Sequence, residues 1–202
     1  MMFIRSFVFF FGVLATLLLG WAALVGIPDI MISEIEPPEE LERYTAEEAF
    51  GREIYIREGC VYCHSQQVRP EGFGADQERF WGRPSVPADY VYDRPHLLGT
   101  MRTGPDLLNI GVRQTSISWH MEHLYDPRLV VEGSTMPPYP WLFEVKRTAG
   151  PDDYVLDIPE DRVPDGKVVV ATPEAEALVE YLLSLDRSYD SPQRVVDNDE
   201  EE

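Results

Sequence analysis

The hydrophobic positions of this chain form one long continuous run, followed by shorter segments with helical periodicity. Residues 7–27 are almost wholly apolar and carry no charged side chain. A helix of about 20 such residues can cross the roughly 30 Å hydrocarbon core of a bilayer. A cleaved signal peptide is the alternative, but its apolar stretch is usually only about 7–15 residues long. The pattern favours a transmembrane signal-anchor over residues 1–28, in contact with lipid through residues 7–27.

The first helix signal after this run is Thr45-Ala-Glu-Glu48, which has the form of a capping box. In that arrangement the threonine hydroxyl accepts a hydrogen bond from the third helical amide, and the glutamate reaches back to the threonine amide. The helix is expected to end near Glu58, because Gly59 follows. Gly51 lies inside it, and a glycine there indicates close approach by another helix.

Two further helices are expected in the second half of the chain. Ser116 or Ser118 can cap one that ends before Pro127. Thr172 can cap the last helix, with Pro173 at its first position. The buried stripe of this last helix is expected to consist of Ala177, Leu178, Tyr181, Leu182 and Leu185.

The remaining segments indicate irregular structure and one hairpin. Residues 69–98 are rich in glycine, proline and aromatic side chains, and they form an insertion too long for an ordinary connection. Residues 154–158 and 167–171 have the composition of two hairpin strands. The expected fold is mainly α, with a small β-hairpin. It divides into the anchor, an acidic proline-containing linker at 29–43, a folded domain at 44–188 and an acidic tail at 189–202.

The charge of the chain limits its partners and orients it in the membrane. The formal net charge is −19, which excludes nucleic acid as a partner because phosphate binding needs a basic surface. Arg5 precedes the apolar run, and five acidic residues follow it within residues 29–40. By the positive-inside rule, the N-terminus lies in the cytoplasm and the folded domain lies on the outer side.

The chemistry of the chain is concentrated in Cys60-Val-Tyr-Cys63-His64. C-x-x-C-H is the attachment pattern of c-type haem: two thiols reach the vinyl groups of one porphyrin edge, and the adjacent histidine ligates the iron. A zinc site would need further nearby ligands. A thioredoxin-like redox pair would follow a strand, whereas this motif follows a predicted helix. We therefore predict one covalently bound haem c, whose attachment outside bacterial membranes agrees with the orientation from charge.

A methionine is the expected sixth ligand of the iron, because a thioether opposite histidine suits electron transfer. Met136 is favoured, since it lies in the proline-stiffened Ser134-Thr-Met-Pro-Pro138 segment. Met101 is the reserve candidate, and Met121 reads as packing on a helix. His96, His120 and His123 are further candidate ligands, although surface or interface roles are the simpler interpretation for each.

Other residues near these motifs are candidates for contact with the haem. Arg102 and Arg113 flank the turn at residues 104–107, and arginine matches a propionate carboxylate with a bidentate fork. Ordinary surface arginines are the alternative reading. Pro105 and Trp119 are candidates for packing against the haem.

The order of these motifs resembles a class I cytochrome c. Several segments are more specific and resemble subunit II, the mono-haem subunit, of the cbb3-type cytochrome c oxidases. These segments are residues 51–59, 64–70 and 102–107, Trp119-His120-x-x-His123-Leu124, Asp126-Pro-Arg128 and residues 134–142.

The resemblance implies that Cys60, Cys63, His64 and Met136 carry the haem. It further implies that electrons arrive from a di-haem cytochrome subunit or a soluble cytochrome and pass to a haem–copper subunit that reduces oxygen. The expected location is the bacterial inner membrane, with the haem domain in the periplasm as part of a respiratory chain. Gly51 and Tyr55 are expected to pack against Tyr181.

The chain itself carries no sign of bond-making catalysis. Paired carboxylates, a nucleophile with a base and a phosphate loop are all missing from the sequence, so a non-catalytic electron-transfer subunit is expected. Two alternatives remain open from the sequence. One is the small cytochrome subunit of a nitric oxide reductase, and the other is a free-standing anchored carrier or haem sensor.

Overall fold

The computed structural model describes residues 2–99, 101–163 and 166–190. It contains two compact units, which are treated separately. The first consists of residues 1–41 with 86–91, and the second of residues 42–85 with 92–202. The expected acidic tail lies outside the described residues from position 191 onward.

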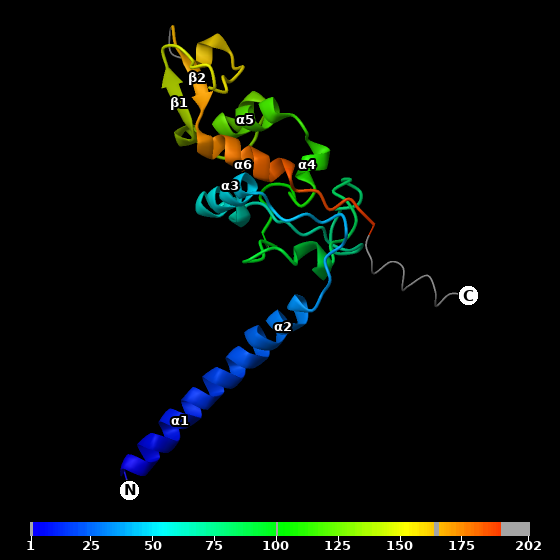
Figure 1. Cartoon of the computed structure of the whole chain (residues 1–202), viewed down its shortest axis with the longest axis vertical. Helices are drawn as coiled ribbons and strands as arrows, with labels where there is room; N and C mark the ends of the chain where they lie inside the picture. The colour runs from blue at the N-terminus through cyan, green and yellow to red at the C-terminus, as the bar shows by residue number, and fades with distance from the viewer. Residues whose placement is uncertain (1, 100, 164–165, 191–202) are drawn as a thin grey trace, which may run out of the picture. The chain divides into compact units, whose positions relative to one another are not determined.

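The first unit is built on the N-terminal helix (Figure 1). Helix α1 spans Met2–Trp21, a π-helical turn spans Ala22–Gly26, and α2 spans Ile27–Ser33. The stretch Arg5–Ser33 is long and apolar enough to cross a membrane. It runs past residue 28, where the sequence reading ended the anchor. Pro28 is tolerated because it lies in the first turn of α2, directly after the π-helical turn.

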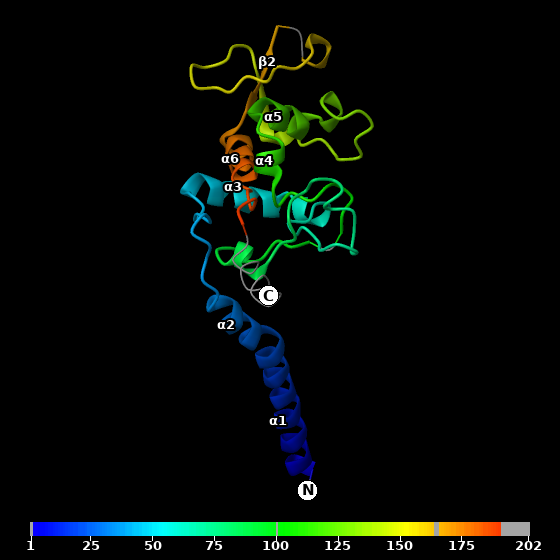
Figure 2. The same cartoon turned by 90° about the vertical axis from the view of Figure 1, so that its right-hand side faces the viewer.

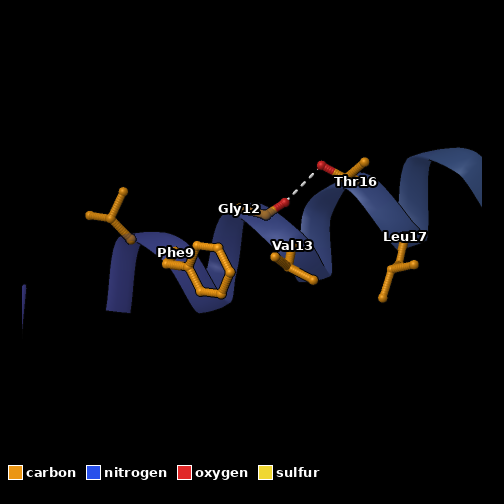
Figure 3. A pocket seen from close by; sticks show the side chains of 6 residues that line it. Phe9, Gly12, Val13, Thr16 and Leu17 are labelled. Carbon is orange, nitrogen blue, oxygen red and sulfur yellow. Dashed lines mark hydrogen bonds between the residues drawn. The ribbon is translucent and has the colours of Figure 1, made fainter. Parts of the chain in front are cut away.

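A shallow apolar groove follows one side of α1 (Figure 3). Its lining residues are Val8, Phe9, Gly12, Val13, Thr16 and Leu17. The Thr16 hydroxyl donates a 2.9 Å hydrogen bond to the Gly12 carbonyl. This bond satisfies the one hydroxyl of the groove within the helix, as hydrocarbon surroundings require.

The second unit is organised around helix α6, Pro173–Leu183, against which α3, Ala46–Arg57, packs (Figures 1 and 2). A side chain at Gly51 would overlap the carbonyl of Ala177, so glycine alone allows this crossing. The rings of Tyr55 and Tyr181 meet edge to face at 5.6 Å. The expected packing of Gly51 and Tyr55 against Tyr181 is therefore confirmed.

Two shorter helices complete the packing around α6 (Figure 2). Helix α4, Ile110–Arg113, was not expected from the sequence, and its Gly111 lies against the backbone of Leu183. Helix α5 spans Ile117–Tyr125. The predicted caps are confirmed: Thr45 and Glu48 form the capping box of α3, Ser116 caps α5 and Thr172 caps α6.

The small sheet has a different partner strand from the expected one. Strand β2, Val168–Ala171, pairs antiparallel with β1, Phe143–Lys146. The segment expected as its partner, 154–158, contributes one bridge, between Val155 and Val170. Its backbone joins β2 through two bonds, from Leu156 N to Val169 O and from Ala171 N to Tyr154 O, each 2.9 Å. Residues 143–146 form the partner strand in place of 154–158, because Phe143 at their start is buried in the core directly after Leu142.

Candidate functional site

The two cysteines lie in a tight turn directly after α3. Gly59 adopts a left-handed conformation with φ of 76°, which ends the helix and starts a 3-10 turn over Cys60–Tyr62. The amides of Cys63 and His64 both donate to the Cys60 carbonyl, at 3.1 and 2.9 Å. Both cysteines are free thiols, with Cys60 buried and Cys63 exposed. Burial raises the pKa of Cys60 to about 12, so this thiol is protonated at neutral pH.

The imidazole of His64 is held in one orientation by the turn at residues 104–105. Its Nδ1 lies 2.7 Å from the Pro105 carbonyl. A carbonyl oxygen can only accept, so Nδ1 carries the proton and Nε2 keeps a free lone pair. Gly104 lies against the ring, where any side chain would overlap it, and its amide donates to Cys63 O at 2.9 Å. Burial lowers the pKa of His64, which favours the neutral, ligating form.

A buried network of hydrogen bonds and ion pairs adjoins this turn. The carboxylate of Asp106 accepts from the Ser65 hydroxyl at 2.6 Å, the Gln67 amide at 2.7 Å and the Leu108 amide at 2.9 Å. These bonds join the segment after His64 to the segment that carries Pro105. Asp106 was missed as a site residue, although its place in the Gly-Pro-Asp-Leu turn was the available signal.

Arg102 belongs to the same network. Its guanidinium donates to Ser65 Oγ and Asp76 Oδ1, both at 2.6 Å, and to the Gln67 carbonyl at 2.7 Å. Asp76 lies in the irregular insertion, so Arg102 fastens the insertion to the His64 turn. Most of its donors are thereby used within the chain. This geometry favours a structural role over the expected contact with a haem propionate.

Arg113, the other candidate for a propionate, is differently placed at the end of α4. Its Nη2 donates to the Asp106 carbonyl. Its Nε is buried and has no hydrogen-bond partner among the described residues. Burial lowers the pKa of this guanidinium. Arg113 therefore keeps a donor free for a group that the protein does not itself supply.

The two histidines of α5 have different surroundings, although they share a helix face. His120 Nε2 donates to the Gln114 carbonyl at 2.9 Å. The His123 ring stacks on Trp119 at 4.5 Å between centroids and 10° between planes, and its Nδ1 is buried without a partner among the described residues. Burial lowers the pKa of His123 to about 4, with His64 and His120 contributing.

Metal binding by these histidines finds no support. No group of three histidine, cysteine or acidic side chains that could hold a metal occurs in the described part of the chain. His96, in the insertion, lies 3.2 Å from Arg94 Nη1. His96 and His120 thus read as hydrogen-bonding groups, whereas His123 Nδ1 has no partner among the described residues.

Met136 lies beside the same apolar cluster that contains Cys60. Its amide donates to Ser134 Oγ at 3.3 Å, and its carbonyl accepts from Arg128 Nη2 at 3.2 Å. Tyr139, three residues on, packs against the same cluster, and burial raises its pKa to about 12. The Met136 segment therefore lies alongside the cysteine turn.

The other methionines are less suited to the role of ligand. Met121 is only 2% exposed and packs in the core, as expected. Met101, the reserve candidate, is 66% exposed. Met31 lies on α2, in the first unit.

The arrangement of the second unit fits a haem. Two free thiols, a histidine whose Nε2 is available and a methionine on a fastened loop come from adjoining segments. Two buried donors, Arg113 Nε and His123 Nδ1, lack protein partners in the described residues.

Comparison with known proteins gives one family. The family model described as "Cytochrome C oxidase, mono-heme subunit/FixO" matches residues 2–151, which are 150 of the 202 residues of the chain. A search of curated proteins found no match.

Proposed function

Because the chain belongs to the family of mono-haem subunits (FixO) of cytochrome c oxidases, we propose that it is a membrane-anchored c-type cytochrome that relays electrons to the catalytic subunit of that oxidase. The family makes it one subunit of an oxidase complex with one haem. The observation that carries the rest of the proposal is the 2.7 Å bond from His64 Nδ1 to Pro105 O. It presents Nε2 as an iron ligand next to two free cysteines.

The residues that would hold the haem divide into attachment and ligation. Cys60 and Cys63 would hold the haem covalently through their sulfur atoms. His64 and Met136 would ligate its iron. The bound haem supplies one-electron exchange at its iron. Ligation by methionine would raise its reduction potential.

The rest of the second unit is proposed to form a class I cytochrome c domain over residues 44–188. The α3–α6 crossing at Gly51 and the helix α5 support this assignment. Residues 71–98 are the least regular part of the domain and, as an insertion, are a candidate contact with neighbouring subunits.

The proposed partners follow from the relay role. Electrons arrive from a di-haem cytochrome subunit or a soluble cytochrome and leave to a haem–copper subunit that reduces oxygen. The apolar helix Arg5–Ser33 supports a single-pass anchor. With Arg5 on the cytoplasmic side, the haem domain lies in the periplasm of the inner membrane. The description of the family as a cytochrome c oxidase subunit favours oxygen over nitric oxide as the substrate of the complex.

Purification of the intact complex with the variant Met136→Ala tests the proposal. Parent complex should contain copper, a high-spin haem and one low-spin haem c on this subunit, and it should turn over oxygen. Met136→Ala should keep the covalent haem but lose the low-spin spectrum and lower the potential. A complex without copper, or one that reduces nitric oxide and not oxygen, would contradict the oxidase relay. An unchanged spectrum in the variant would contradict ligation by Met136 and favour a sensor or another ligand.

A further inference from the structure

The buried polar atoms without hydrogen-bond partners form a short and informative set. Among the described residues they are Arg52 Nε, Tyr55 OH, Asp93 Oδ1, Arg113 Nε and His123 Nδ1. Arg52 and Asp93 compensate each other as an ion pair at 3.6 Å. The Tyr55 hydroxyl lies next to the Gln66 side chain, which acts on its pKa. Two nitrogens, Arg113 Nε and His123 Nδ1, remain without a hydrogen-bond partner among the described residues, although the Arg113 guanidinium lies over the Trp81 ring at 5.8 Å.

Both nitrogens lie on helices that pack against α6, Arg113 on α4 and His123 on α5. Arg113 Nη2 donates to the carbonyl of Asp106, the residue after Pro105, whose carbonyl accepts from His64 Nδ1. Buried polar atoms normally have partners, because an unmade hydrogen bond in the interior is costly. Two unpartnered nitrogens on these adjoining helices therefore point to a group with several acceptor oxygens at this place.

The ring of His123 is held in position rather than free to turn away. It stacks nearly parallel on Trp119. Helix α5, which carries both rings, is also joined to the segment of the sixth ligand, because the Leu124 carbonyl accepts from the Tyr139 amide at 2.9 Å. The His123 ring is thus held on a helix that is joined to the Met136 segment.

We propose that His123 is a positioning residue whose Nδ1–H donates a hydrogen bond to a haem propionate. This inference rests on the proposed c-type haem. The propionates are the polar groups of a haem, and as carboxylates they can only accept. Neutral imidazole can carry its proton on Nδ1. The bond reduces the negative charge that the propionate presents to the iron, and so it favours the ferrous state and raises the reduction potential.

His120 provides a matched control on the same helix face. Its Nε2 is already bonded to the Gln114 carbonyl, so it has no donor to offer the haem at that nitrogen. His123→Phe keeps a ring to stack on Trp119 but removes the donor. His123→Asn places an amide N–H near the position of Nδ1. His120→Gln keeps a donor near the position of Nε2 for Gln114.

The test uses the purified oxidase complex carrying each variant. Spectroelectrochemical titration measures the potential of this haem, resonance Raman spectroscopy measures the propionate bending band, and a pyridine haemochrome assay measures haem content. At equal haem content, His123→Phe should lower the potential and shift the propionate band. His123→Asn should restore both toward the parent values, and His120→Gln should change neither.

The outcomes separate this inference from the proposed function. A parent subunit without covalent haem contradicts the proposed function itself. A parent with haem and an unchanged His123→Phe overturns the role of His123 alone. Equal shifts in His123→Phe and His123→Asn also overturn it, because they show that packing of the ring and not its donor is responsible.

Discussion

The segments on either side of His64 satisfy their buried polar groups in different ways. In the His64 turn, residues 60–67 and 102–108, no described buried side-chain nitrogen or oxygen lacks a hydrogen-bond partner. In the α4–α5 segment, residues 110–125, Arg113 Nε and His123 Nδ1 are buried and unpartnered. The difference indicates that the buried polar side chains of the turn are satisfied within the chain, whereas the α4–α5 segment leaves two buried nitrogens for an outside partner.

The largest effect is expected from a substitution at Gly104, in the His64 turn. In Gly104→Ala the added methyl would overlap the His64 ring and displace its Nε2. We expect complete loss of the low-spin spectrum while the haem remains attached through the cysteines. Absorption spectroscopy and a haem stain of the denatured subunit measure the two effects. Gly150→Ala is the control, because its nearest neighbours lie at ordinary contact distances of 3.5 Å and more. A normal spectrum in Gly104→Ala would show that the turn does not fix the ligand.

Removal of the network carboxylate should have the next largest effect. Asp106→Ala deprives four donors of their acceptor, among them the Arg102 guanidinium at 3.5 Å, and leaves buried groups unpaired. The expected loss is roughly 3–5 kcal/mol in the free energy of unfolding. Denaturant titration of the full chain measures it, with Asp153→Ala at the half-exposed ion pair with Lys146 as the control. The loss should be the same before and after haem attachment, since the network needs no ligand; a loss confined to the haem-bound form would contradict this.

Substitution of Arg102 and of Arg113 compares the His64 turn with the α4–α5 segment directly. Arg102→Gln breaks a buried pair with Asp76, so the free energy of unfolding should fall by about 3–5 kcal/mol. Arg113→Gln removes one bond to the Asp106 carbonyl and should cost about 1 kcal/mol. The reduction potential should respond in the opposite order, with the larger decrease in Arg113→Gln. A larger decrease in Arg102→Gln would restore Arg102 as the partner of the propionate.

The smallest expected effect is a pH dependence of the free energy of unfolding, which arises from Asp76. Burial acts to raise the pKa of Asp76, but hydrogen bonds from Arg102 and the Arg69 amide outweigh it, and the pKa is lowered. The ionised Asp76 carboxylate therefore stabilises the fold at pH values above its unfolded pKa near 4. This stabilisation is lost as the pH falls through the lower pKa of the native state. Denaturant titrations across acidic pH should show this loss, and Asp76→Asn should remove part of it. An equal slope in both proteins would contradict the assignment.

Local signals explain what the sequence predicted well. The helices after Thr45, Ser116 and Thr172 were found because their caps lie within three residues of the groups that they satisfy. The motif at Cys60-Val-Tyr-Cys63-His64 is likewise contiguous. The matched family agrees with the resemblance to the mono-haem subunit that these motifs gave.

Several departures depend on contacts that the local sequence pattern does not reveal. Strand β1 was missed because its partner, β2, lies more than 20 residues away in the sequence. The preference of Arg102 for Asp76 was hidden because Asp76 lies in an irregular insertion, 26 positions earlier. The different surroundings of His120 and His123 could not follow from their spacing, since both lie on one helix face. The Gln114 carbonyl, which bonds His120, and the Trp119 ring, on which His123 stacks, distinguish them.

The central claim is that a haem is covalently bound at Cys60 and Cys63. Acid–acetone extraction of the purified subunit, followed by mass spectrometry of the peptide that contains residues 60–64, tests it most directly. We expect the haem to resist extraction and this peptide to carry the mass of one haem, with the Cys60→Ala, Cys63→Ala double variant carrying none. Complete extraction of the haem, with both thiols of the peptide free, would contradict the claim.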